Sequence, residues 1–141
     1  GGWTSANYSA LACPDFPTCQ GQWWPDTDFG EAFVLWRSIG VDYEGGVLDL
    51  AARVSIHLAH RIGAVITLLV LGFLTLRLLA TPGTRNGGIL LGVVLLTQVT
   101  LGVLNVVLFL PLPNAVAHNG VGALLLATVL WLLFHSRLSR N

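Results

Sequence analysis

Three long apolar stretches constrain the fold of this chain more than any other feature. They cover residues 49–80, 88–110 and 113–136, and the apolar part of the third ends at Phe134. A helix needs about 20 mostly apolar residues to cross the hydrocarbon core of a bilayer. No alternation of period two competes with the helical interpretation. We therefore predict an all-α membrane protein in which three transmembrane helices form an antiparallel bundle.

The composition and the breakers between the stretches agree with this fold. Hydrophobic residues make up 54% of the chain, charged residues 10%, and Lys is absent; these values are typical of a membrane protein. Residues 81–88 form a turn cluster, and residues 111–114 form a tight link rich in Pro. Asp49 is placed to cap the first helix, and Pro113 suits the first turn of the third. The chain contains no Met and begins at Gly1, so we expect it to be part of a longer protein.

The charged residues are distributed unequally between the two ends of the predicted helices. Arginines mark the cytoplasmic side of a membrane protein. We therefore predict that residues 1–48 are an extracytoplasmic segment and that residues 49–141 form the bundle with a cytoplasmic C-terminus. The acidic residues lie at or before the start of the first helix: Asp15, Asp26, Asp28, Glu31, Asp42, Glu44 and Asp49. The arginines that flank the first turn and the C-terminus are Arg77, Arg85, Arg137 and Arg140.

Two histidines lie inside the apolar stretches, and the predicted orientation puts both in the outer half of the bilayer. His60 is on the first helix and His118 on the third. An ionisable side chain at this depth usually faces the bundle interior and serves a site. Neutral imidazole suits iron, copper and zinc, and haem iron is commonly held by His. A bare ion wants three or four ligands, and His57 adds only one. Haem therefore fits the pattern better.

The first helix carries further polar residues on the face of His60. Arg53, His57, Arg61 and Ala64 follow spacings of three and four with it, so they share one stripe. Arg61 or Arg53 is placed to meet the propionates of a haem. In the alternative interpretation, this end of the helix lies among lipid headgroups, with the Arg side chains extended to water and the His side chains hydrogen-bonded.

Small residues surround His118 on the third helix. Ala117, Gly120 and Gly122 leave space in which a planar cofactor would fit, although plain helix packing explains them equally well.

The remaining polar residues of the bundle have simpler interpretations. Gln98, Gly102 and Asn105 form a polar and small line on the second helix and are expected to hydrogen-bond within the bundle. His135 is interpreted as a residue at the membrane boundary.

The extracytoplasmic segment contains a pair of cysteines, Cys13 and Cys19, within the run Cys-Pro-Asp-Phe-Pro-Thr-Cys. In an oxidising compartment the spacing favours a structural disulfide over a metal site, and a redox-active thiol pair stays open as an alternative. Trp23, Trp24 and Trp36 are the residues expected to rest on the membrane interface.

Three motifs together carry a resemblance to a known family. Residues 12–25 read Ala-Cys-Pro-Asp-Phe-Pro-Thr-Cys-Gln-Gly-Gln-Trp-Trp-Pro, residues 57–61 read His-Leu-Ala-His-Arg, and residues 110–113 read Leu-Pro-Leu-Pro before Ala117, His118 and Asn119. This ordered set, which covers nearly the whole chain, resembles the haem A synthase family. The Leu-Pro-Leu-Pro run indicates its carboxy-terminal half.

The resemblance implies a particular organisation and ligand set. By this resemblance, members of the family consist of two fused four-helix halves. This chain would be the second half without its first helix. His60 and His118 would be the axial ligands of a b-type haem (haem b iron). In the amino-terminal half a Glu implicated in catalysis lies three residues before the His of the His-Arg motif; His57 occupies that position here. His57 would then lie near a propionate, and the catalytic residues stay unknown.

The implied reaction is oxidation of a ring methyl of haem O to the formyl group of haem A, for assembly of a terminal oxidase in the bacterial inner (plasma) membrane. Expected partners are membrane lipid, the substrate haem O, the missing amino-terminal half, and haem O synthase or terminal oxidase subunits; we expect no nucleic acid. The chain would belong to an oxidoreductase, with the activity of this piece alone left open. The alternatives are a b-type electron-transfer cytochrome subunit, and a structural or ion-transport bundle.

Overall fold

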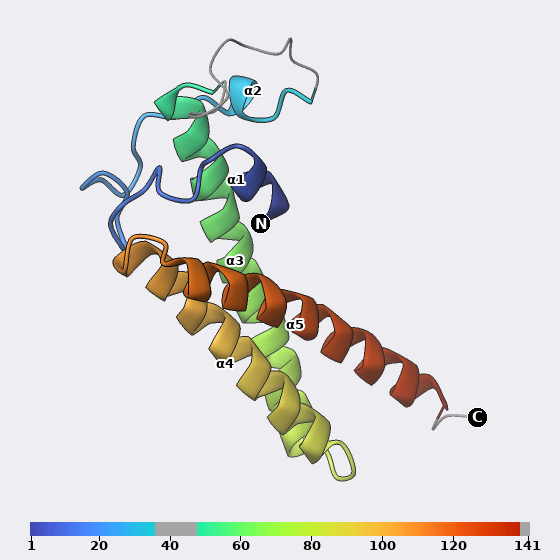
Figure 1. Ribbon diagram of the computed structural model, residues 1–141. Coiled ribbons are helices and arrows are strands. Elements are labelled where there is room, and N and C mark those ends of the chain that lie inside the picture. The colour runs from blue at the N-terminus through green and yellow to red at the C-terminus, as the bar shows by residue number, and fades with distance from the viewer. Residues whose placement is uncertain (36–47, 139–141) are drawn as a thin grey trace. The chain divides into compact units, whose positions relative to one another are not determined.

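The computed structural model describes residues 1–35 and 48–138, with side chains described up to residue 135. The helices are α1 (Gly2–Ala6), α2 (Phe29–Ala32), α3 (Leu50–Ala80), α4 (Arg85–Val107) and α5 (Leu112–Leu138) (Figure 1). The predicted all-α membrane architecture is confirmed. The predictions for Trp36, Asp42, Glu44 and Arg140 concern residues outside the described part. The side chain of Arg137 also lies outside it.

Helices α3, α4 and α5 are each long and apolar enough to cross a membrane. Large apolar side chains on them, such as Leu69 and Phe73, are exposed at the protein surface. In water such a surface would be unfavourable, but lipid tails are as apolar as these side chains. The chain is therefore a membrane protein with three spanning helices in the part of it that the structure describes.

The ends of the spanning helices have local causes. Oδ1 of Asp49 accepts a hydrogen bond from the amide of Ala52 (2.9 Å), so Asp49 caps α3 as the sequence predicts. Helix α4 ends at Val107, whereas the apolar pattern predicts residue 110. Phe109 and Leu110 adopt left-handed backbone conformations (φ 56° and 59°). The amide of Leu110 thereby reaches back to the carbonyl of Asn105 (2.7 Å) and closes the helix.

The chain divides into two compact units. The first consists of Gly1–Gly63 and Val103–Pro111, and the second of Ala64–Gly102 and Leu112–Asn141. In the first unit, the N-terminal segment packs on the opening turns of α3. Its two small cores contain Ala12, Cys13, Cys19 and Val54 in one cluster, and Ala32, Leu48, Ala52 and Ile56, with Trp3 against them, in the other.

Hydrogen bonds to main-chain groups complete the first unit. The indole of Trp3 donates to the carbonyl of Ala32 (2.9 Å). The amide of Asp28 donates to Oγ of Ser55 (2.8 Å), which is fully buried on α3. These bonds link residues that are far apart in the sequence, Trp3 with Ala32 and Asp28 with Ser55.

In the second unit, α4 runs back along the second half of α3, and α5 packs against them (Figure 1). The core is formed by Leu91, Val94, Leu95 and Leu125, with leucines and valines of all three helices around it. Two glycines at the start of α4 permit the close approach. A Cβ on Gly87 would stand 2.6 Å from Leu132, and one on Gly88 would stand 3.0 Å from Leu78.

Candidate functional site

The loop of the two cysteines is compact and ordered by its own polar groups. The sulfur atoms of Cys13 and Cys19 lie 2.01 Å apart, at bonding distance, and both side chains are buried. Cys19 and Gln22 exchange main-chain hydrogen bonds of 2.9 and 3.1 Å across a tight turn. Gly21 adopts a positive φ of 73° in that turn, a conformation that favours glycine. This geometry is compatible with the predicted disulfide.

The side chain of Asp15 organises the interior of the same loop. Its carboxylate accepts hydrogen bonds from the hydroxyl of Thr18 and from the amides of Gln20 (2.6 Å) and Gly21 (3.0 Å). The bond from Thr18 has the largest effect, and together these donors lower the pKa of Asp15 below its ordinary value of 3.8. The carboxylate is therefore ionised throughout the neutral and mildly acidic range.

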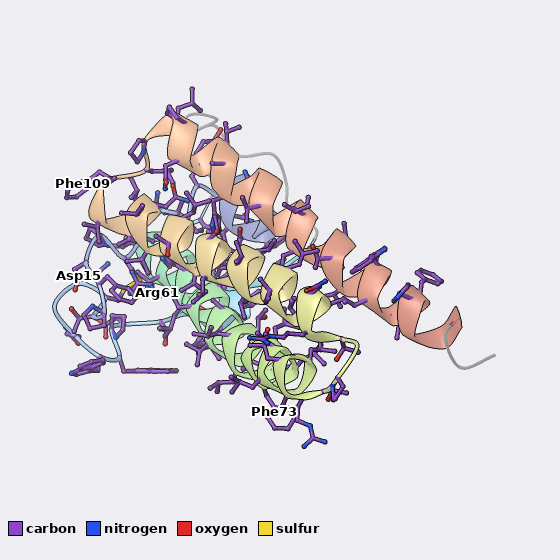
Figure 2. The ribbon with its side chains drawn as sticks, turned by 90° about the horizontal axis from the view of Figure 1, so that it is seen from below. Asp15, Arg61, Phe73 and Phe109 are labelled. Atoms are coloured by element: carbon purple, nitrogen blue, oxygen red, sulfur yellow. A yellow bond between two sulfur atoms is a disulfide. The ribbon has the colours of Figure 1, made fainter. Side chains whose placement is uncertain are left out.

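Arg61 on α3 reaches into this loop (Figure 2). Nη2 donates to the carbonyls of Cys13 (3.2 Å) and Asp15 (2.7 Å). Nη1 donates to the carbonyls of Thr18 (2.8 Å) and Pro17 (3.4 Å). In the structure this guanidinium binds the main chain of the loop; its contact with haem propionates stays a prediction.

His57 is buried and also contacts the N-terminal segment. Its Nδ1 lies 3.0 Å from the carbonyl oxygen of Ser9. A carbonyl only accepts hydrogen bonds, so Nδ1 carries the proton in this contact. His57 and Arg61, four residues apart on one face of α3, therefore both bind backbone carbonyls of the segment that covers that face.

His60 and Arg53 are half-buried on the same helix. A Cβ on Gly1 would stand 3.8 Å from Cε1 of His60, so this imidazole lies close to the start of the chain. His60 belongs to the first unit and His118 to the second.

His118 lies between α5 and α4 in the second unit and is half-buried. Its Nε2 is 3.4 Å from Nε2 of Gln98. Gly102 lies against the edge of the ring, where an added Cβ would be 3.1 Å from Cε1. Gly122 lies in the same way against the amide of Gln98, at 3.2 Å. Oε1 of Gln98 is buried and has no hydrogen-bond partner among the described residues.

The small residues near His118 thus differ in what they face. Gly102 and Gly122 give room to the polar pair formed by Gln98 and His118, which is a packing role between helices. Gly120 has nothing within 4 Å of the position of an added Cβ, and Ala117 is exposed on α5. Open space therefore remains on the side of α5 that carries Gly120.

The histidine at the far end of α5 has a simple environment. The ring of His135 stacks on that of Trp131, with centroids 5.5 Å apart and planes 15° apart. The interpretation of His135 as a residue at the membrane boundary stays a prediction. Among the residues that the structure describes, no three His, Cys, Asp or Glu side chains gather as they would around a metal ion.

The fold and these side chains define a helical membrane protein that carries imidazoles within its spanning helices and holds a closed polar loop on α3. Residues 1–130 match the model of COX15-CtaA, cytochrome oxidase assembly protein, and the chain belongs to this family. Over its whole length it is 45% identical to haem A synthase of Shewanella oneidensis. It spans 44% of the length of that relative, a carboxy-terminal half. No solved structure matches the chain.

Proposed function

We propose that this chain is the haem-binding half of a haem A synthase, a membrane oxidoreductase of haem A biosynthesis. The observation that carries the proposal is the 45% identity to a haem A synthase along the entire chain. In the proposed reaction a ring methyl of haem O is oxidised to the formyl group of haem A, for assembly of a terminal oxidase. The amino-terminal half, haem O synthase and terminal oxidase subunits are the partners that belong to this proposal.

His60 and His118 are the proposed axial ligands of a b-type haem. The donor set supports haem over a bare ion. A protein-bound dication wants three or four protein ligands, and the described residues offer no group of three. Haem iron receives four nitrogens from its own ring and needs only two from the protein. When bound, the iron would supply one-electron redox chemistry.

The contacts of His118 bear on how it would hold such a cofactor. The amide nitrogen of Gln98 lies 3.4 Å from Nε2 of His118 and can only donate to it, so iron bound at Nε2 would replace this contact. Gly120, two residues from His118 on α5, leaves open space on another face of the helix. Arg61 contacts loop carbonyls through its terminal nitrogens, and Nδ1 of His57 contacts the carbonyl of Ser9. A cofactor-binding role of these two residues stays a proposal beside the axial pair of His60 and His118.

The location of the proposed site follows from the arginines. Arg77 and Arg85 flank the turn between α3 and α4, and arginines of this kind mark the cytoplasmic side. The cysteine loop, at the opposite end of α3, would then be extracytoplasmic. In that compartment Cys13 and Cys19 would persist as a disulfide.

Absorbance of the full-length protein tests the ligand assignment. The wild type should show a Soret band with the low-spin spectrum of six-coordinate haem. His60→Ala and His118→Ala should each lose that spectrum, while His135→Ala, which only unstacks a ring from Trp131, should keep it. An unchanged spectrum in either of the first two variants would refute the ligand pair.

A second measurement separates a haem A synthase from an electron-transfer cytochrome. Membranes from cells that lack the endogenous enzyme and express the full-length protein should contain haem A when their extracted haems are separated by chromatography. Membranes that contain haem O but no haem A, despite a normal low-spin spectrum of the protein, would instead support the cytochrome alternative.

A further inference from the structure

The contacts of Arg61 account for nearly all of its hydrogen-bonding capacity. A guanidinium has five N–H groups, of which four are on the terminal nitrogens. Those two nitrogens face four carbonyl oxygens of the loop, those of Cys13, Asp15, Pro17 and Thr18. The remaining group, Nε–H, is buried and has no hydrogen-bond partner among the described residues. No pair of donors is left for the forked binding of a carboxylate.

The loop surrounds the guanidinium of Arg61 with main-chain carbonyl oxygens. None of these contacting oxygens carries a formal negative charge. Main-chain carbonyls of residues 13–18 converge on the guanidinium, and its carbon lies 5.7 Å from the centroid of the Phe16 ring. Carbonyls next to a membrane helix need donors, because lipid offers none. Arg61 and the loop therefore satisfy each other.

We infer that Arg61 is a positioning residue which holds the loop of residues 13–19 on α3 and thereby keeps Cys13 beside Cys19. The contacting oxygens come from both ends and from the middle of the loop, so one side chain fixes the path of the chain between the two cysteines. This inference is independent of haem binding.

Closure of the cysteine pair and binding of Arg61 are then thermodynamically linked. If Arg61 binds the closed loop better than the open one, its contacts favour closure by the same factor. Hydrogen bonds to a charged group each change an equilibrium constant by about tenfold or more. The two thiols react with oxidised glutathione to give the loop disulfide and two molecules of reduced glutathione. Loss of the guanidinium should therefore lower the equilibrium constant of this reaction by at least about tenfold.

The experiment compares Arg61→Lys with Arg77→Lys in the full-length protein. Both arginines lie on α3 and both stand over a phenyl ring, Phe16 at 5.7 Å and Phe73 at 6.0 Å, and both variants keep the charge. Only Arg61 contacts the loop carbonyls. The readouts are the fraction of closed Cys pair in glutathione buffers and hydrogen–deuterium exchange of residues 13–22.

In Arg61→Lys the ratio of open to closed Cys pair in glutathione buffer should rise by at least about tenfold. Hydrogen–deuterium exchange should become faster in residues 13–22 and stay slow in α4. Arg77→Lys should behave as wild type in both measurements. Equal thiol equilibria and equal loop exchange in the two variants would overturn the inference. Unchanged loop behaviour with loss of the haem spectrum in Arg61→Lys would also overturn it, because it would assign Arg61 to an anion of the cofactor.

If Arg61→Lys does not accumulate, the wild type still tests the inference. Phenylglyoxal modifies accessible guanidinium groups, and Arg85 at the start of α4 is exposed. Arg61 should be modified at least about tenfold more slowly than Arg85 while the pair is closed, in keeping with its occupied donors. Equal rates of modification would contradict the inference.

Discussion

Gln98 and His118 face each other between α4 and α5, with the two Nε2 atoms 3.4 Å apart. Each of them also lies against a glycine of the opposite helix. The two contacts, Gln98 with Gly122 and Gly102 with His118, are one helical turn apart on each helix and run in opposite order. This is the register of two antiparallel helices in close contact, and it places the amide where it governs the orientation of the imidazole.

Gln98→Leu should strengthen haem binding through His118. The substitution keeps the approximate volume but removes the amide donor that faces Nε2 of His118. Iron bound at Nε2 would then displace no hydrogen bond, whose net worth of about 0.5–1.5 kcal/mol corresponds to a gain of up to about tenfold in affinity. The ratio of Soret to protein absorbance during titration with haem measures the effect. Thr97→Ala is the control, because that hydroxyl bonds only the carbonyl of Val93 on its own helix; equal affinities in the two variants would contradict the prediction.

Alanine substitutions should distinguish the two glycines that pack against side chains, Gly102 and Gly122, from Gly120, which faces open space. A Cβ on Gly102 would press on His118 at 3.1 Å and one on Gly122 on Gln98 at 3.2 Å, whereas Gly120 has no neighbour within 4 Å. Overpacking should destabilise Gly102→Ala and Gly122→Ala by about 1–3 kcal/mol. Gly120→Ala should be neutral or stabilising by up to about 1 kcal/mol, since Ala favours helix. Thermal unfolding in detergent measures all three, and destabilisation of Gly120→Ala would show that its surroundings are filled.

The spanning helices could be predicted from the sequence because length and apolar character alone decide them. The early end of α4 could not. It depends on left-handed conformations at Phe109 and Leu110, which bulky residues rarely adopt. The sequence around residues 107–110 is uniformly apolar and carries no signal of such a turn.

The polar residues of α3 show a second limit of the sequence. The spacing of His57 and Arg61 places them on one face of α3, but it does not indicate their partners, which are main-chain carbonyls of the N-terminal segment. Every residue has a main-chain carbonyl, so the sequence does not indicate which carbonyls will accept a hydrogen bond. The pairing of Gln98 with His118, in contrast, had a signal, since Gln98 and Gly102 repeat the spacing of His118 and Gly122.

His57→Ala should loosen the N-terminal segment from α3. The buried bond from Nδ1 to the carbonyl of Ser9 would be lost, while that carbonyl still accepts from the amide of Ala12 (3.2 Å). Loss of one such hydrogen bond costs about 0.5–1.5 kcal/mol. His57→Asn should restore much of the stability, because its amide nitrogen can occupy the position of Nδ1. Limited proteolysis of residues 1–35 in the full-length protein measures the change. If His57→Ala instead loses the haem spectrum while its N-terminal segment stays protected, His57 serves the cofactor and this prediction is wrong.

The order of the cysteine loop should decrease in acid, and Asp15 should be the cause. Hydrogen bonds, chiefly from Thr18, lower the pKa of Asp15 in the folded loop below its ordinary value of 3.8. A group with a lowered folded pKa stabilises the fold above its unfolded pKa, and this stabilisation disappears as the pH falls through the folded value. Protection of residues 19–22 from hydrogen exchange, corrected for the intrinsic rate, should therefore be constant from neutral pH to about pH 5 and fall below about pH 4. Asp15→Asn should be less protected at neutral pH and show no such fall; a wild-type fall that persists in the variant would assign the titration to another group.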